Sequence, residues 1–181
     1  MAHEQRGRDL SQELVDYVCD HLFAANSSWP RDSFFSRDKY AKVLAGRIAR
    51  AVGESPIEYA LAWVNGERHG TEIGFRATVF TAEAVISGCI LSSNNDNHPP
   101  IGDVKIVPRK AIRTLVLHSV YNFEDEKSHT DTFFTATYEG LDPVVVDTAD
   151  YRLQRDGHVD KLFGALQVDL LETIVNVSPR S

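Results

Sequence analysis

From residue 57 to residue 148, the apolar residues of this 181-residue chain recur with a period of two, in short segments separated by turn signals. This period is typical of β-strands, whose successive side chains point to opposite faces of a sheet. Helical periodicity occurs only before and after this region. Because the strands follow one another without intervening helices, we expect antiparallel pairing and an α+β fold. The order excludes the alternating strands and helices of a parallel nucleotide-binding fold.

The period-two region predicts six or seven strands. Tyr59, Leu61 and Trp63 share one parity, which is typical of a half-buried strand, and Asn65-Gly66 is a strong signal for a hairpin turn. Further strands are expected within residues 71–81 and at residues 84–91, 104–107, 112–121, 132–138 and 144–148. A polar loop at residues 92–102 and an acidic loop at residues 122–131 interrupt the series.

Apolar residues with helical spacing predict two helices in residues 1–56 and one at the C-terminus. The second helix is expected to begin near Ser33 or Ser36 and to end before Gly53, which is placed as a C-terminal cap. The last helix is expected to begin at Asp156 or Gly157. Its apolar stripe comprises Val159, Leu162, Phe163, Leu166, Leu170, Ile174 and Val175.

These elements predict an N-terminal helical hairpin at residues 1–56 that packs on a β-rich domain at residues 57–181. The hairpin is electrically neutral, and the β-rich part carries the whole formal net charge of −7. An acidic chain lacks the basic footprint of a nucleic-acid-binding protein, so we expect no nucleic-acid partner.

Cys19 and Cys89 are too few for a disulfide scaffold or a four-cysteine zinc site, and each lies in an apolar segment. Residues 1–20 contain no apolar core of a signal peptide, and no apolar run approaches the ~20 residues that span a bilayer. We therefore expect a soluble, cytoplasmic protein without a membrane span.

Three segments and the helix that follows them carry a family resemblance. The segments are RATVFTAEAVISGCIL (76–91), VKIVPRKAIRTLVLH (104–118) and FFTATYEGLDPVVVDTAD (133–150). In this order they resemble the bacterial form of the pleckstrin-homology-like (PH-like) superfold over residues ~75–175. The resemblance implies a PH-like barrel of antiparallel strands, one end of which is plugged by the C-terminal helix. An extra hairpin at residues 58–75 and the two N-terminal helices depart from the family pattern.

The resemblance also implies a binding function. Some members of the family bind phosphoinositides through basic residues on the first hairpin, here residues 81–88, which contain Glu83 and neither Lys nor Arg. This departure argues against phosphoinositide binding. Other members bind peptides with a sheet edge or a helix face, so the first hypothesis is a non-enzymatic binding or scaffold module. Its partner would be a protein or a second copy of the chain.

Two clusters are candidate binding sites. Lys105, Arg109, Lys110 and Arg113 place four cations within nine residues of an acidic chain, which predicts either a local anion site or a solvated strand and turn. The aromatic cluster of Trp29, Phe34, Phe35 and Tyr40 predicts either an interface or the packing of the helical pair on the rest of the chain.

The sequence predicts no catalytic, metal or cofactor site, because the nucleophile-elbow, phosphate-loop, dinucleotide and zinc-protease motifs are all missing. A metal set of His118, His129 and Asp131 is left as an alternative. A small-molecule-binding or lyase/isomerase fold of cone shape is a second hypothesis, with His118, Tyr121, Asp147 or Asp150 as acid and base. Such a fold would leave a cavity with a buried polar pair beneath the C-terminal helix, whereas a plugged barrel would not. The third hypothesis is that the chain is a structural subunit of a larger assembly, such as a ring.

Overall fold

A computed structural model describes residues 2–31, 38–65, 74–91, 102–121, 131–147 and 158–177. The helices are α1 (Ala2–Ala25), α2 (Asp38–Val52) and α3 (His158–Val177), with a short 3₁₀-helix, η1 (Arg109–Ala111), before β5. The strands are β1 (Tyr59–Asn65), β2 (Gly74–Phe80), β3 (Ala84–Leu91), β4 (Val104–Pro108), β5 (Ile112–Tyr121), β6 (Asp131–Tyr138) and β7 (Val144–Asp147). The α+β class and the element order are confirmed. The predicted helix starts at residues 33, 36, 156 and 157 lie outside the described residues.

The strands form two antiparallel sheets and not one closed barrel. The first sheet has the order β1-β2-β3-β4 and the second the order β5-β6-β7, so strands adjacent in sequence are adjacent in each sheet. The expectation of a single closed sheet is thus not met in the described hydrogen bonding. Between β4 and β5 the chain passes through Pro108, which has no N–H to donate, and then through η1, so the ladder ends there.

The chain divides into two compact units. The first comprises residues 1–81 and 86–106, and the second comprises residues 82–85 and 107–181. This division does not follow the boundary that the sequence predicts after residue 56. The reason is that α1 packs on β1 and α2 on β2, so the helices share a core with the first sheet.

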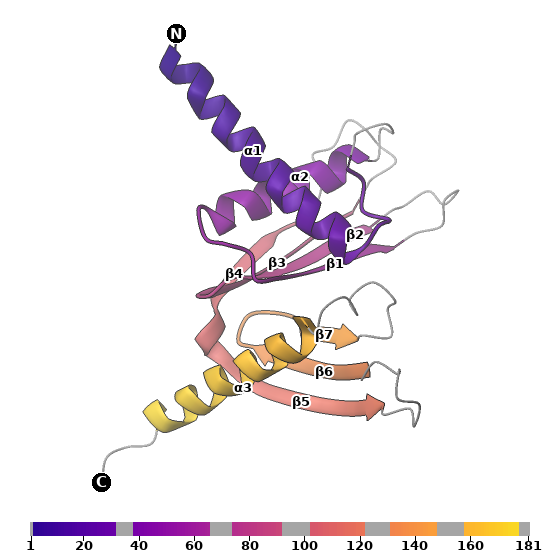
Figure 1. The fold of residues 1–181 in the computed structure, drawn as a ribbon, viewed down its shortest axis with the longest axis vertical. Coiled ribbons are helices and arrows are strands. Elements are labelled where there is room, and N and C mark those ends of the chain that lie inside the picture. Colours follow the sequence, from indigo (N-terminus) through magenta and orange to yellow (C-terminus); the bar gives the residue numbers. More distant parts are fainter. Residues whose placement is uncertain are drawn as a thin grey trace. The chain divides into compact units, whose positions relative to one another are not determined.

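In the first unit, α1 and α2 lie on one face of the four-stranded sheet (Figure 1). On β1, Ala60 and Ala62 pair in register with Val79 and Ala77, and both alanines are buried together with Tyr59 and Leu61. The expectation of a half-buried β1 is therefore corrected for residues 59–62, which are buried at both parities. Small side chains at alternate positions let a helix approach the sheet closely.

The second unit consists of the three-stranded sheet with α3 packed on it (Figure 1). Its core joins buried residues of the strands to the first half of the helix: Ile112, Phe134, Ala136, Val144 and Val146 with Val159, Leu162 and Leu166. The rings of Phe134 and Phe163 lie 5.2 Å apart. Within the described ranges, no helix is both long and apolar enough to cross a membrane.

Glycines with positive φ end two of the elements. Gly53 follows α2 with a φ of 59°, and its N–H donates to the carbonyl of Ala49 at 3.0 Å. The predicted C-terminal cap is therefore confirmed, because this left-handed conformation is strained for residues with a Cβ. Gly140, with a φ of 85°, lies in the turn between β6 and β7.

Candidate interaction surface on the C-terminal helix

A buried ion pair anchors α3 to the segment that precedes β5. The Nε of Arg109 lies 2.7 Å from the Oδ2 of Asp169, and the two side chains are only 12% and 6% exposed. A guanidinium offers several donors in a fixed plane, so it satisfies a buried carboxylate better than an ammonium would. The pair fixes the middle of α3 against η1.

Two further contacts extend this anchor. The Nζ of Lys110 lies 2.8 Å from the Oε2 of Glu172, and both side chains are largely in solvent. The hydroxyl of Thr173 lies 2.6 Å from the carbonyl oxygen of Lys110 and 2.9 Å from that of Asp169, so its single proton can be donated to either. The hydrogen bond and the negative charge of Glu172 raise the pKa of Lys110. We call these contacts of Arg109, Lys110, Asp169, Glu172 and Thr173 the α3 clamp.

Tyr138 adds a buried polar group near the clamp. Its side chain is buried, and its hydroxyl has no hydrogen-bond partner within the described ranges. Burial raises the pKa of the Tyr138 phenol, the negative charge of Asp169 raises it further, and the charge of Arg109 lowers it. The phenol therefore stays neutral, and no described contact makes it an acid or a base for a substrate.

The opposite face of α3 is apolar and exposed. Val168, Leu171, Ile174 and Val175 are between 55% and 72% exposed, although the clamp holds the same two turns of the helix in place. Positions three and four apart lie on one side of a helix, so Val168, Leu171 and Val175 form a continuous stripe. We call these three residues, with Ile174 beside them, the α3 ridge. In Figure 1, α3 crosses its sheet and continues past the strands toward the C-terminus.

The α3 ridge differs from the helical stripe that the sequence predicts. Of that stripe, Val159, Leu162 and Leu166 are buried, but Ile174 and Val175 are exposed. Helical spacing marks apolar positions, whereas burial also requires a neighbouring surface. In the second half of α3, Asp169 and Thr173 occupy the side that contacts η1. The helix therefore has one apolar face in the core and a second in solvent.

The predicted basic cluster is distributed over ion pairs. Arg109 and Lys110 belong to the α3 clamp, and Arg113 pairs with Glu139 in the turn after β6. Lys105 is exposed on β4, in the part of the chain that belongs to the first unit. Three of the four cations thus have carboxylate partners within their own unit. The anion-site prediction itself stays a prediction.

The predicted aromatic cluster contributes to the core of the first unit. Trp29 and Tyr40 are 1% and 4% exposed, and the Trp29 ring lies edge-to-face with Phe75 at 5.6 Å. These two rings are core residues and do not form a surface, because the loop after α1 turns Trp29 back onto β2. Phe34 and Phe35 lie outside the described residues.

The residues of the acid–base alternative are only partly described. The Nε2 of His118 lies 2.8 Å from the Oγ1 of Thr135, and the His118 ring stacks on Phe133 with centroids 4.5 Å apart. In register, Phe133 pairs with Asp147, and Tyr121 pairs with Asp131. The side chains of Tyr121, Asp131 and Asp147, and the whole of His129 and Asp150, lie outside the description. Among described side chains, no group of three potential ligands could hold a metal ion.

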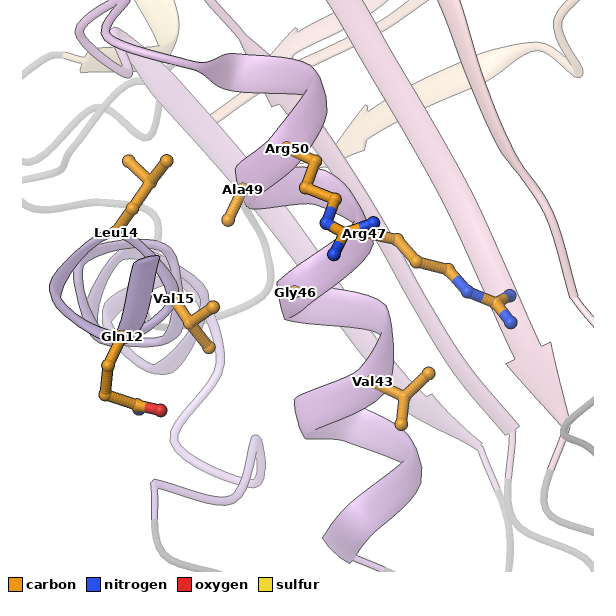
Figure 2. A pocket seen from close by; sticks show the side chains of 8 residues that line it. All are labelled: Gln12, Leu14, Val15, Val43, Gly46, Arg47, Ala49 and Arg50. Atoms are coloured by element: carbon orange, nitrogen blue, oxygen red, sulfur yellow. The ribbon is translucent and has the colours of Figure 1, made fainter. Parts of the chain in front are cut away.

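A groove between α1 and α2 has a volume of about 340 Å³ (Figure 2). It is lined by Gln12, Leu14 and Val15 from α1 and by Val43, Gly46, Arg47, Ala49 and Arg50 from α2. Val15 points toward α2, whereas Arg47 points away from α1 and donates to the carbonyl of Gly102 at 2.6 Å (Figure 2). The described side chains that line it provide no acid–base pair.

Comparisons with protein-family models, curated proteins and solved structures found nothing that matches this chain. The contacts of its own side chains are therefore the basis for any functional assignment.

Proposed function

We propose that the chain is a binding module that recognises another protein surface through the α3 ridge. One observation carries the proposal: the clamp and the core fix α3 on one side, while the other side presents large aliphatic side chains that are more than half exposed. Exposed apolar patches of this kind mark interaction sites more often than scattered single residues do. Over residues ~75–175, strands β2–β7 followed by one amphipathic helix also have the element order on which the resemblance to the PH-like superfold rests, and in that superfold helix faces bind peptides.

The charges around the ridge favour a protein over a membrane. Helices that lie on anionic bilayers carry Lys and Arg on the polar face beside their apolar face. The described part of α3 has Lys161 as its one cation, against Asp160, Asp169 and Glu172. Since the clamp already pairs Arg109 with Asp169 and Lys110 with Glu172, the ridge offers an anionic bilayer little positive charge, whereas an apolar protein surface needs none.

The first test asks whether the ridge is a free surface, by urea unfolding of a Leu171→Gln/Val175→Gln variant of the full chain. Polar replacement of exposed residues is expected to change the free energy of unfolding by less than about 0.5 kcal/mol. Leu166→Ala, on the buried face of the same helix, is the matched control and should cost about 2–5 kcal/mol. If the ridge variant loses as much unfolding free energy as Leu166→Ala, the chain itself covers the ridge, and the proposal is refuted.

The second test is co-sedimentation with vesicles that contain phosphatidylserine. We expect the chain to stay in the supernatant. Strong binding that the ridge variant abolishes would show that the ridge is a lipid-binding face, and the assignment to a protein partner would then be wrong.

A further inference from the structure

We propose that the surface recognised by the α3 ridge is the same ridge of a second copy, so that two chains pair through antiparallel α3 helices. This inference rests on the proposed function of the ridge. Gly164, Val168, Leu171 and Val175 are spaced by four, three and four residues, which is the spacing of the core positions of a coiled coil. Gly164 belongs to this row because the space where its Cβ would lie is open.

Electrostatics is the first argument for a second copy as the occupant. When a surface pairs with its own copy, each charge on it meets a second charge of the same sign. Because the chain has a net charge of −7, most of its surface therefore opposes self-association. The second half of α3 avoids this repulsion because the clamp pairs Asp169 with Arg109 and Glu172 with Lys110. The other flank of the ridge carries the neutral Gln167. The ridge is therefore an apolar stripe whose flanking charges are balanced. Two copies of it can pack together without net charge repulsion.

The side chains also select one register. With Val168 facing Leu171 of the second copy, Gly164 faces Val175, so the smallest core position receives a bulky partner at each end. In this register Glu172 lies beside Ala165 of the second copy. A shift of seven residues one way brings the two Glu172 side chains together, and a shift the other way places Lys161 against Leu171. A parallel pair would set Gly164 against Gly164 and leave a gap.

The size of the surface predicts a weak and reversible dimer. One helix pair with four core positions per copy buries less than the ~1,600 Å² of a standard interface, so we expect a dissociation constant on the order of 100 µM. Association should depend on protein concentration, and a partner helix that binds the ridge more tightly should displace the second copy.

The experiment is sedimentation equilibrium of the full chain from about 5 µM to about 1 mM, a range that brackets the expected constant. The wild type is expected to shift from monomer to dimer. Leu171→Glu should weaken the dimer by at least about tenfold because it places a charge in the helix interface. Val145→Glu is the control, since it adds the same charge at an exposed position on β7 and should leave the dimer intact.

Cysteine pairing tests the register, in a background in which the exposed Cys89 is replaced by serine. A mixture of Val168→Cys and Leu171→Cys chains should form the mixed disulfide far faster than either variant forms a disulfide with itself. Preferential pairing of like variants would overturn the antiparallel arrangement.

The outcomes separate this inference from the proposed function. The self-pairing is overturned if the chain stays monomeric up to 1 mM or if the dimer survives Leu171→Glu. If Leu171→Gln/Val175→Gln nevertheless keeps its stability, the ridge is a free surface, and the proposed binding of a different protein still stands. If that glutamine variant unfolds, the ridge is covered within the chain, and both conclusions fail. Circular dichroism of Leu171→Glu checks that a lost dimer does not reflect a lost fold.

Discussion

Replacing Arg109 with methionine should destabilise the second unit by about 2–4 kcal/mol. The substitution keeps much of the aliphatic stem but leaves the carboxylate of Asp169, whose side chain is 6% exposed, without its 2.7 Å partner. Removing one member of a fully buried pair costs about 3–5 kcal/mol, and the slight exposure of Arg109 reduces this figure.

Two variants separate a buried charge from a general loss of contacts. Lys110→Met breaks the neighbouring pair with Glu172, which is mostly in solvent, and should therefore cost much less stability than Arg109→Met. Adding Asp169→Leu to Arg109→Met removes the stranded carboxylate and should restore most of the lost stability.

Urea unfolding can assign the loss to one unit. The chain has two tryptophans, Trp29 and Trp63, and both belong to the first unit. Tryptophan fluorescence therefore follows the first unit, while far-UV circular dichroism follows both. We expect Arg109→Met to shift the dichroism transition more than the fluorescence transition. An Arg109→Met variant that loses no more stability than Lys110→Met would refute the argument that burial makes this pair important.

Three further predictions concern the core. A Cβ on Gly102 would lie 2.1 Å from the carbonyl oxygen of Cys89, so Gly102→Ala should lower the thermal midpoint, whereas Gly46→Ala adds a contact at 3.8 Å to Val15 and should raise it slightly; equal midpoints would contradict this. Burial raises the pKa of Tyr59 and Tyr138, so each phenol holds its proton more tightly in the folded chain. Unfolding free energy should therefore fall above about pH 10, by up to about 1.4 kcal/mol per pH unit and tyrosine, and Tyr59→Phe should reduce the slope. Burial also raises the pKa of Cys19 to about 11, so a thiol reagent should modify the exposed Cys89 first and Cys19 only at the rate of unfolding; comparable rates would show that Cys19 is accessible.

The sequence alone determined the local structure. Residues 84–91 and 112–121 were predicted as strands and have these bounds in the structure, because alternation of apolar residues reflects backbone geometry that each segment carries by itself. Gly53 was predicted as a cap for the same reason, since a positive φ is a property of one residue.

Only the tertiary structure decided which groups meet. The sequence shows Arg109 and Lys110 as part of a basic cluster, but their partners Asp169 and Glu172 are 60 and 62 residues away. Likewise, a helical pattern does not distinguish the buried Leu166 from the exposed Leu171, because each is apolar and only the position of the sheet separates them. Periodicity is set by the backbone of one segment, whereas charge compensation and burial depend on a second surface that the chain supplies only when it folds.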